Sequence, residues 1–146
     1  MNFSTASRSL MFAGLIPFFA GTIAIVLEVD SWWIINDTAN SFALYALAIA
    51  SFMSGIHWAV ARLQGNRMDL LFHSNLMVLL PWIAFVTFGD GAVFYFLLAF
   101  VFFKQYLLDR QLKKQGIFDQ AYLCDRLIIA TIVCLLMLLV AGIKVY

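Results

Sequence analysis

Charged residues are scarce in this 146-residue chain, and their scarcity excludes a soluble globular fold. Only 12% of the residues are charged and 64% are hydrophobic, whereas soluble domains carry about 25% charged residues. A helix that crosses the ~30 Å hydrocarbon core needs about 20 mainly apolar residues, so the chain has room for roughly five spans. The composition predicts an all-α polytopic membrane protein, a compact five-helix bundle in which residues 1–146 form one domain.

Cysteine is also rare, and the spacing of the two cysteines excludes an intrachain disulfide. Cys124 and Cys134 lie on the same expected helix, where ten residues span about 15 Å. That separation is too long for a disulfide. Neither cysteine has the paired spacing typical of a zinc or redox motif, so we interpret both as small packing residues.

Motifs that support catalysis are missing as well. The sequence contains no nucleophile–base pair, metal-ligand cluster, phosphate-binding loop or pair of carboxylates within a span. We therefore expect no enzymatic activity, no metal and no cofactor. The net charge of +1 does not indicate a nucleic-acid partner, and the expected surroundings are the lipid bilayer.

The apolar runs predict where the five helices lie. Their expected limits are Ser9 to Leu27, Ala39 to Ala61, Leu70 to Phe88, Ala92 to Leu108, and Leu123 to Val145. The first run exceeds a signal-peptide core and lacks a clear cleavage site, so we expect it to be retained. Pro17 and Pro81 lie inside the first and third runs, where each removes a backbone donor and can introduce a kink.

The distribution of charge predicts the orientation in the membrane. Eight of the nine basic residues lie at one end of the predicted spans: Arg8, Arg62, Arg67, Lys104, Arg110, Lys113, Lys114 and Arg126. The opposite end carries Glu28, Asp30, Asp37, Asp90 and the remaining Lys144. The positive-inside rule then predicts a cytoplasmic N-terminus and an external C-terminus, in the inner membrane of the cell.

The second predicted helix contains the most informative residue, His57. At 100° per residue, one stripe of this helix collects Ala43, Ala46, Ala50, Ser54, His57 and Ala61. Small residues allow a neighbouring helix to approach closely, so we expect this stripe to be buried. An inward-facing His57 could be a proton-accepting switch or a ligand, or it could make an ordinary interhelical hydrogen bond. Trp58 is expected to be an interfacial or packing aromatic residue.

His73 could reach a similar depth on the third helix, where two facing histidines could ligate a haem iron. However, Ser74 and Asn75 follow His73, a pattern typical of a hydrated helix end.

The fourth and fifth helices supply the other candidate residues. The aromatic run from Phe94 to Phe103 predicts a surface that faces lipid or a partner. Beyond it, the spacing of Gln105, Asp109 and Lys113 predicts a helix end that projects past the bilayer with an Asp109–Lys113 surface pair.

Charges on neighbouring helix ends could also act together. Arg62, Asp109 and Arg110 are expected to meet Asp125 and Arg126 at the cytoplasmic boundary. Such a cluster could hold an anionic lipid headgroup or a phosphate-bearing ligand, or it could serve only topology and mutual neutralisation.

Several short segments resemble one known family over nearly the whole chain. They are GLIPF at 14–18, SFMSGIHWAVA at 51–61, LPW at 80–82, LLDR at 107–110 and YLCDR at 122–126. GIHW, which contains Gly55, is the most specific. The chain resembles the domain of unknown function 3429 family, bacterial and mitochondrial membrane proteins related to animal transmembrane protein 69. The resemblance implies a small multispan inner-membrane protein without an assigned activity.

The sequence leaves two classes of function open. The leading hypothesis is a small scaffold or accessory subunit that packs against a membrane protein partner, another copy of itself, or lipid. The alternative is a small proton-coupled transporter or cofactor-binding membrane protein that uses His57.

Overall fold

Every regular element in the described part of the chain is a helix. The computed structural model describes residues 3–31, 35, 37–65 and 67–145. The helices are α1 (Phe3–Ala13), α2 (Leu15–Val26), α3 (Thr38–Leu63), α4 (Met68–Phe88), α5 (Ala92–Lys114) and α6 (Gln120–Ile143). Five stretches are long and apolar enough to cross a membrane, and α1 and α2 together provide the first. The predicted all-α polytopic membrane fold is confirmed.

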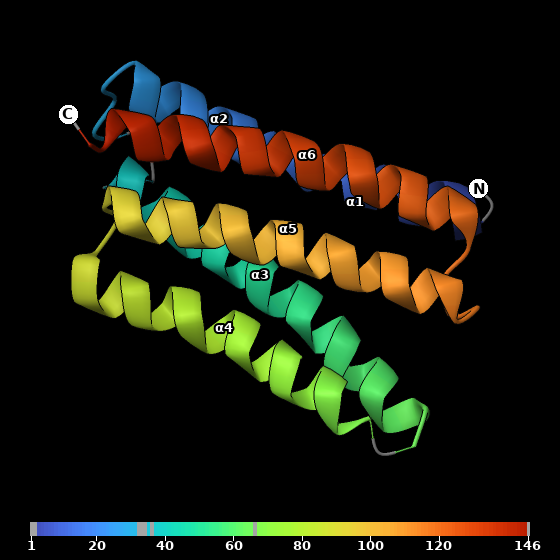
Figure 1. Ribbon diagram of the computed structural model, residues 1–146. Helices are drawn as coiled ribbons and strands as arrows, with labels where there is room; N and C mark the ends of the chain where they lie inside the picture. The colour runs from blue at the N-terminus through green and yellow to red at the C-terminus, as the bar shows by residue number, and fades with distance from the viewer. Residues whose placement is uncertain (1–2, 32–34, 36, 66, 146) are drawn as a thin grey trace.

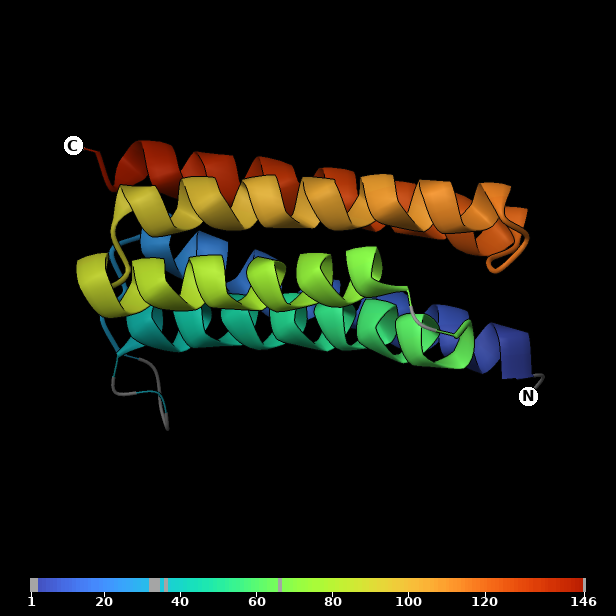
Figure 2. The same ribbon diagram turned by 60° about the horizontal axis from the view of Figure 1, so that its bottom comes forward.

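Four of the spans form a closed ring, and α4 packs against its outside. α2 and α5 each contact both α3 and α6. α4 contacts both α3 and α5 and lies along their outer side (Figure 1). The spans cross the bundle in alternating directions, which leaves the N- and C-termini at opposite ends (Figure 2). The ring encloses the core that holds the candidate site.

The two ends of the bundle differ in charge, as the sequence predicts. The α3–α4 and α5–α6 turns lie at the same end as the N-terminus (Figure 1), and we call this end the basic end. The opposite end, the acidic end, holds an ion pair between Asp90 and Lys144. Asp90 precedes α5 and Lys144 follows α6, so this ion pair joins the start of α5 to the end of α6.

The first span is interrupted between α1 and α2, although the sequence predicts one continuous helix. Pro17 has no N–H to donate to the carbonyl of Ala13, and its ring crowds that carbonyl. The helix is interrupted at Gly14, whose carbonyl accepts a hydrogen bond from the Tyr45 hydroxyl at 2.8 Å. Pro81, in contrast, is buried within the uninterrupted α4. Only one of the two prolines therefore breaks its span.

At the basic end, α5 continues past the apolar run that ends at Leu108 as far as Lys114, as the spacing of Gln105, Asp109 and Lys113 predicts. Leu108 and Leu112 are buried there against residues of α3 and α4, which explains why the helix continues past the long apolar run. Gly116, with φ of 78°, then turns the chain. Asp119 begins α6 by accepting a hydrogen bond from the backbone N–H of Tyr122 at 2.7 Å.

The buried stripe predicted on α3 is confirmed. Its members are all buried: Ala43, Ala46, Ala50, Ser54, His57 and Ala61. The aromatic surface predicted on α5 is only partly correct. Three of its residues are in the core, namely Phe94, Tyr95 and Phe102, and three are exposed, namely Phe96, Phe100 and Phe103. Successive helical residues are rotated by about 100°, so a dense aromatic run necessarily occupies more than one face.

Candidate functional site

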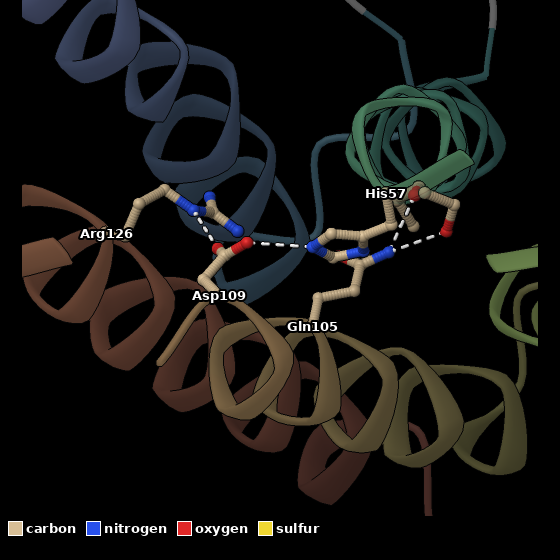
Figure 3. Close-up of polar contacts among 6 residues, drawn as sticks. His57, Gln105, Asp109 and Arg126 are labelled. Atoms are coloured by element: carbon tan, nitrogen blue, oxygen red, sulfur yellow. Dashed lines mark hydrogen bonds and ion pairs between the residues drawn. The ribbon is translucent and has the colours of Figure 1, made fainter. Parts of the chain in front are cut away.

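A buried carboxylate on α5 connects three helices of the ring. Oδ1 of Asp109 lies 2.8 Å from Nε2 of His57 on α3, and Oδ2 accepts a hydrogen bond from Nε of Arg126 on α6 at 2.8 Å (Figure 3). His57 and Asp109 have no exposed surface, and Arg126 is only 6% exposed. We call these three residues the polar triad.

The position of Asp109 corrects the prediction of a surface pair with Lys113. Asp109 is in the core instead of on a helix end in solvent. The reason is its phase on α5, because Phe102, Gln105 and Asp109 follow one another at three- and four-residue intervals on the buried face. The same spacing that suggests a surface pair therefore continues the core stripe of α5.

Gln105 adds a second polar link one turn away from Asp109. Its Nε2 donates to the backbone carbonyl of Ala50 at 2.8 Å and to the Ser54 hydroxyl at 2.9 Å (Figure 3). The small side chains on α3 make this contact possible, because they leave the helix backbone accessible to α5. Hydrogen bonds thus join α3 to α5 over two helical turns, on the face of α3 that carries His57.

The hydrogen bonds of the polar triad determine which atoms remain free. A carboxylate paired with a guanidinium accepts hydrogen bonds, so Nε2 of His57 carries the hydrogen that points to Asp109. Nδ1 of His57 and Nη2 of Arg126 are buried and have no hydrogen-bond partner within residues 3–31, 35, 37–65 and 67–145. The triad therefore has one unused imidazole nitrogen and one unused guanidinium nitrogen in the core.

A second ion pair joins α1 to α6 at the basic end. Arg8 lies 3.0 Å from Asp125, which is mostly buried, whereas Arg8 is largely exposed. Two predicted members of a single charge cluster are not part of it, because Arg110 is exposed and Arg62 lies over the ring of Trp58. The structure thus divides the expected network into two neighbouring pairs.

Only His57 of the GIHW segment enters the core. Trp58 is 48% exposed and contacts Arg62, whose guanidinium carbon is 5.9 Å from the ring centroid. Gly55 is also on the outer face, where an added Cβ atom would meet nothing within 4 Å. These two candidate residues therefore lie on the outer face of α3, away from the polar triad.

The second histidine of the haem hypothesis, His73, lies on α4, which is the third span. His57 is hydrogen-bonded to Asp109, and His73 is half-buried, with no hydrogen-bond partner for Nε2 in the described part of the chain. Within the described residues no group of three or more histidine, cysteine or acidic side chains could hold a metal ion. Cys124 is exposed, and the Cys134 thiol donates to the carbonyl of Ala99.

Comparison with known proteins places the chain in a family. No curated protein and no solved structure matches the chain. A family model described as protein of unknown function (DUF3429) matches residues 4–142, which is nearly the whole chain. The chain therefore belongs to this family, protein of unknown function (DUF3429).

Proposed function

We propose that this protein is a small scaffold or accessory subunit of the inner membrane, without catalytic activity, whose N-terminus is cytoplasmic. The distribution of polar groups in the core carries the proposal. The polar triad and Gln105 lie between the middle of the bundle and the basic end, and they bond to one another or to adjacent helices. Paired groups of this kind fix helices against one another.

In the half of the core toward the acidic end, the polar side chains of the other half are not continued across the bundle. Aromatic and aliphatic side chains close it, including Phe42, Phe94, Tyr95, Met137 and Val140, all less than 5% exposed. Among the described residues, the buried polar groups in this half are the side chains of Thr22 and Thr38 and the hydroxyl of Tyr95, which donates to the carbonyl of Ala39, and none is charged. A transporter requires polar or ionisable groups along its path, so this core favours a static role.

The exposed aromatic residues of α5 offer a surface for a partner helix. Phe96, Phe100 and Phe103 follow one another at intervals of four and three residues, so they share one outward face of α5. Helices associate in membranes mainly through close packing and specific contacts, and aromatic rings supply large contact areas. We call this face the α5 aromatic face and propose it as the contact with a membrane protein partner.

Site-specific photo-cross-linking in native membranes tests the accessory role. A photoreactive amino acid at Phe100 should form one defined adduct with a membrane protein or a second copy of the chain. The matched control is the same amino acid at Ile16, which is also exposed but lies on α2. A Phe100 adduct without an Ile16 adduct supports the proposal. No adduct at Phe100, or the same adducts at both positions, would contradict it.

Transport is the second candidate, favoured by one observation. Nδ1 of His57 is buried, and no described residue hydrogen-bonds to it; an unpaired imidazole nitrogen in a membrane core is able to accept a proton. Proton movement into liposomes that contain the purified protein measures this activity directly. An imposed gradient should dissipate no faster than in empty liposomes if the protein is a scaffold. Faster dissipation that His57→Gln abolishes would establish the transporter instead.

A further inference from the structure

An apolar cavity lies beside the polar triad, between the first span, α3 and α6. Its volume is about 300 Å³, which is at the lower end of the range for small-molecule sites. Most of its wall is hydrophobic, including Leu15 and Phe18 of α2, Met53 of α3, Phe102 of α5 and Val133 of α6. Such a lining favours a hydrocarbon chain.

The cavity is open toward the side of the bundle. Leu10 of α1 and Phe52 of α3 both line it, and they are 74% and 67% exposed. In a membrane-spanning bundle, such side chains face the acyl chains of the bilayer. A lipid could therefore place one acyl chain in the cavity without leaving the membrane plane.

Arg126 provides a polar anchor in the wall of this cavity. It is 6% exposed and lines the cavity from α6, and its Nε is engaged by Asp109. Its Nη2 is buried and has no acceptor among the residues that the structure describes. Because Arg126 lines the cavity and is almost withdrawn from solvent, a negatively charged oxygen atom that a ligand brings to this wall would be stabilised by its guanidinium.

The other polar residues around the cavity are also able to donate hydrogen bonds. Tyr122 lies one turn before Arg126 on α6, and Ser7 lies on α1 near the basic end, and both line the cavity. Eight basic residues but only four acidic ones, Asp69, Asp109, Asp119 and Asp125, belong to this end of the bundle. The excess positive charge favours an anionic group over a neutral one.

The geometry points to a binding site for one anionic phospholipid. One acyl chain would occupy the apolar part of the cavity, and the phosphate oxygens would face Arg126 at its basic end. A guanidinium suits this role because its planar N–H groups match phosphate oxygens, and the bond is charge-assisted. This site goes beyond the accessory role, and it stands whether or not a protein partner binds the α5 aromatic face.

Native mass spectrometry of the purified full chain tests the site. The protein in neutral detergent is titrated with phosphatidylglycerol and, separately, with phosphatidylcholine of the same acyl chains. Ala130→Phe fills the cavity, because Ala130 lines it from α6. Its matched control is Ala59→Phe on the exposed face of α3. We expect one tight phosphatidylglycerol per wild-type chain, retained by Ala59→Phe and weakened by about tenfold or more in Ala130→Phe.

The wild-type chain alone can overturn the proposal. Equal affinity for phosphatidylcholine and phosphatidylglycerol would contradict the preference for an anionic headgroup. If inorganic phosphate displaced bound phosphatidylglycerol as effectively as free phosphatidylglycerol does, the proposal that the cavity binds an acyl chain would be wrong. If Ala130→Phe does not fold, Tyr122→Phe is the second variant, and we expect it to weaken phosphatidylglycerol by about tenfold. Wild-type affinity in a folded Ala130→Phe chain, or in Tyr122→Phe, would place the lipid elsewhere.

Discussion

Arg126 of α6 donates through Nε to Oδ2 of Asp109 on α5 at 2.8 Å, and both side chains are in the core. Neither charge is reached freely by solvent, so each depends on the other for its stabilisation. The second oxygen of Asp109 engages His57 and so extends the connection to α3. One carboxylate thus specifies how three helices of the ring align.

Removing the charge of Asp109 should destabilise the fold strongly. Asp109→Asn leaves the Arg126 guanidinium buried without a counter-charge, and breaking a buried pair in this way costs about 3–5 kcal/mol. The free energy of unfolding in mixed micelles measures the loss. Asp69→Asn is the control, because Asp69 pairs with Arg67 at an exposed position and should change the stability little. Equal losses in the two variants would contradict a special role for burial.

Replacing His57 by glutamine should destabilise the fold less than replacing it by phenylalanine. In His57→Gln the side-chain amide can still donate to Asp109, whereas His57→Phe leaves that carboxylate oxygen without its donor. A buried acceptor left without a donor costs about 1–3 kcal/mol, so the Phe variant should unfold more easily. The thermal unfolding temperatures of the two variants give the comparison. The same temperature for both would show that the hydrogen bond contributes nothing to stability.

Two glycines in different surroundings should respond differently to alanine. A Cβ atom at Gly21 would lie 2.7 Å from Cγ of Phe42, and closer still to Cδ2, whereas at Gly55 it would meet nothing within 4 Å. We expect Gly21→Ala to lower the free energy of unfolding by about 1–3 kcal/mol through overpacking, with Gly55→Ala neutral or slightly stabilising. If Gly55→Ala lowered the stability in native membranes but left that of the purified protein unchanged, a partner at that face would be indicated.

The orientation in the membrane is testable by labelling single cysteines in a background without Cys124 and Cys134. Asp30→Cys and Lys114→Cys both place the thiol at exposed positions, at the acidic and basic ends. The positive-inside rule predicts that an impermeant maleimide labels Asp30→Cys in cells with a permeable outer envelope. Lys114→Cys should react only after the inner membrane is opened. The reverse pattern would invert the topology.

The fold was largely predictable from sequence, because lipid imposes simple requirements on length and hydrophobicity. The small-residue stripe also placed His57 correctly in the core. The partner of His57 was not predictable, because Asp109 lies in a charged segment that reads equally well as a solvated helix end. Its burial depends on the packing of Leu108 and Leu112 against α3 and α4, which only the tertiary structure shows. The cavity likewise depends on the relative positions of four spans, because residues of the first span, α3, α5 and α6 line it.

The most direct test of the polar triad is a double-mutant cycle on Asp109 and Arg126. The free energies of unfolding of Asp109→Asn, Arg126→Gln and the double variant are compared with that of the wild-type chain. We predict that the double variant loses less stability than the two single losses together, by about 0.5–3 kcal/mol, since the second substitution removes the unpaired charge that the first creates. Strictly additive losses would contradict the claim that this pair joins α5 to α6.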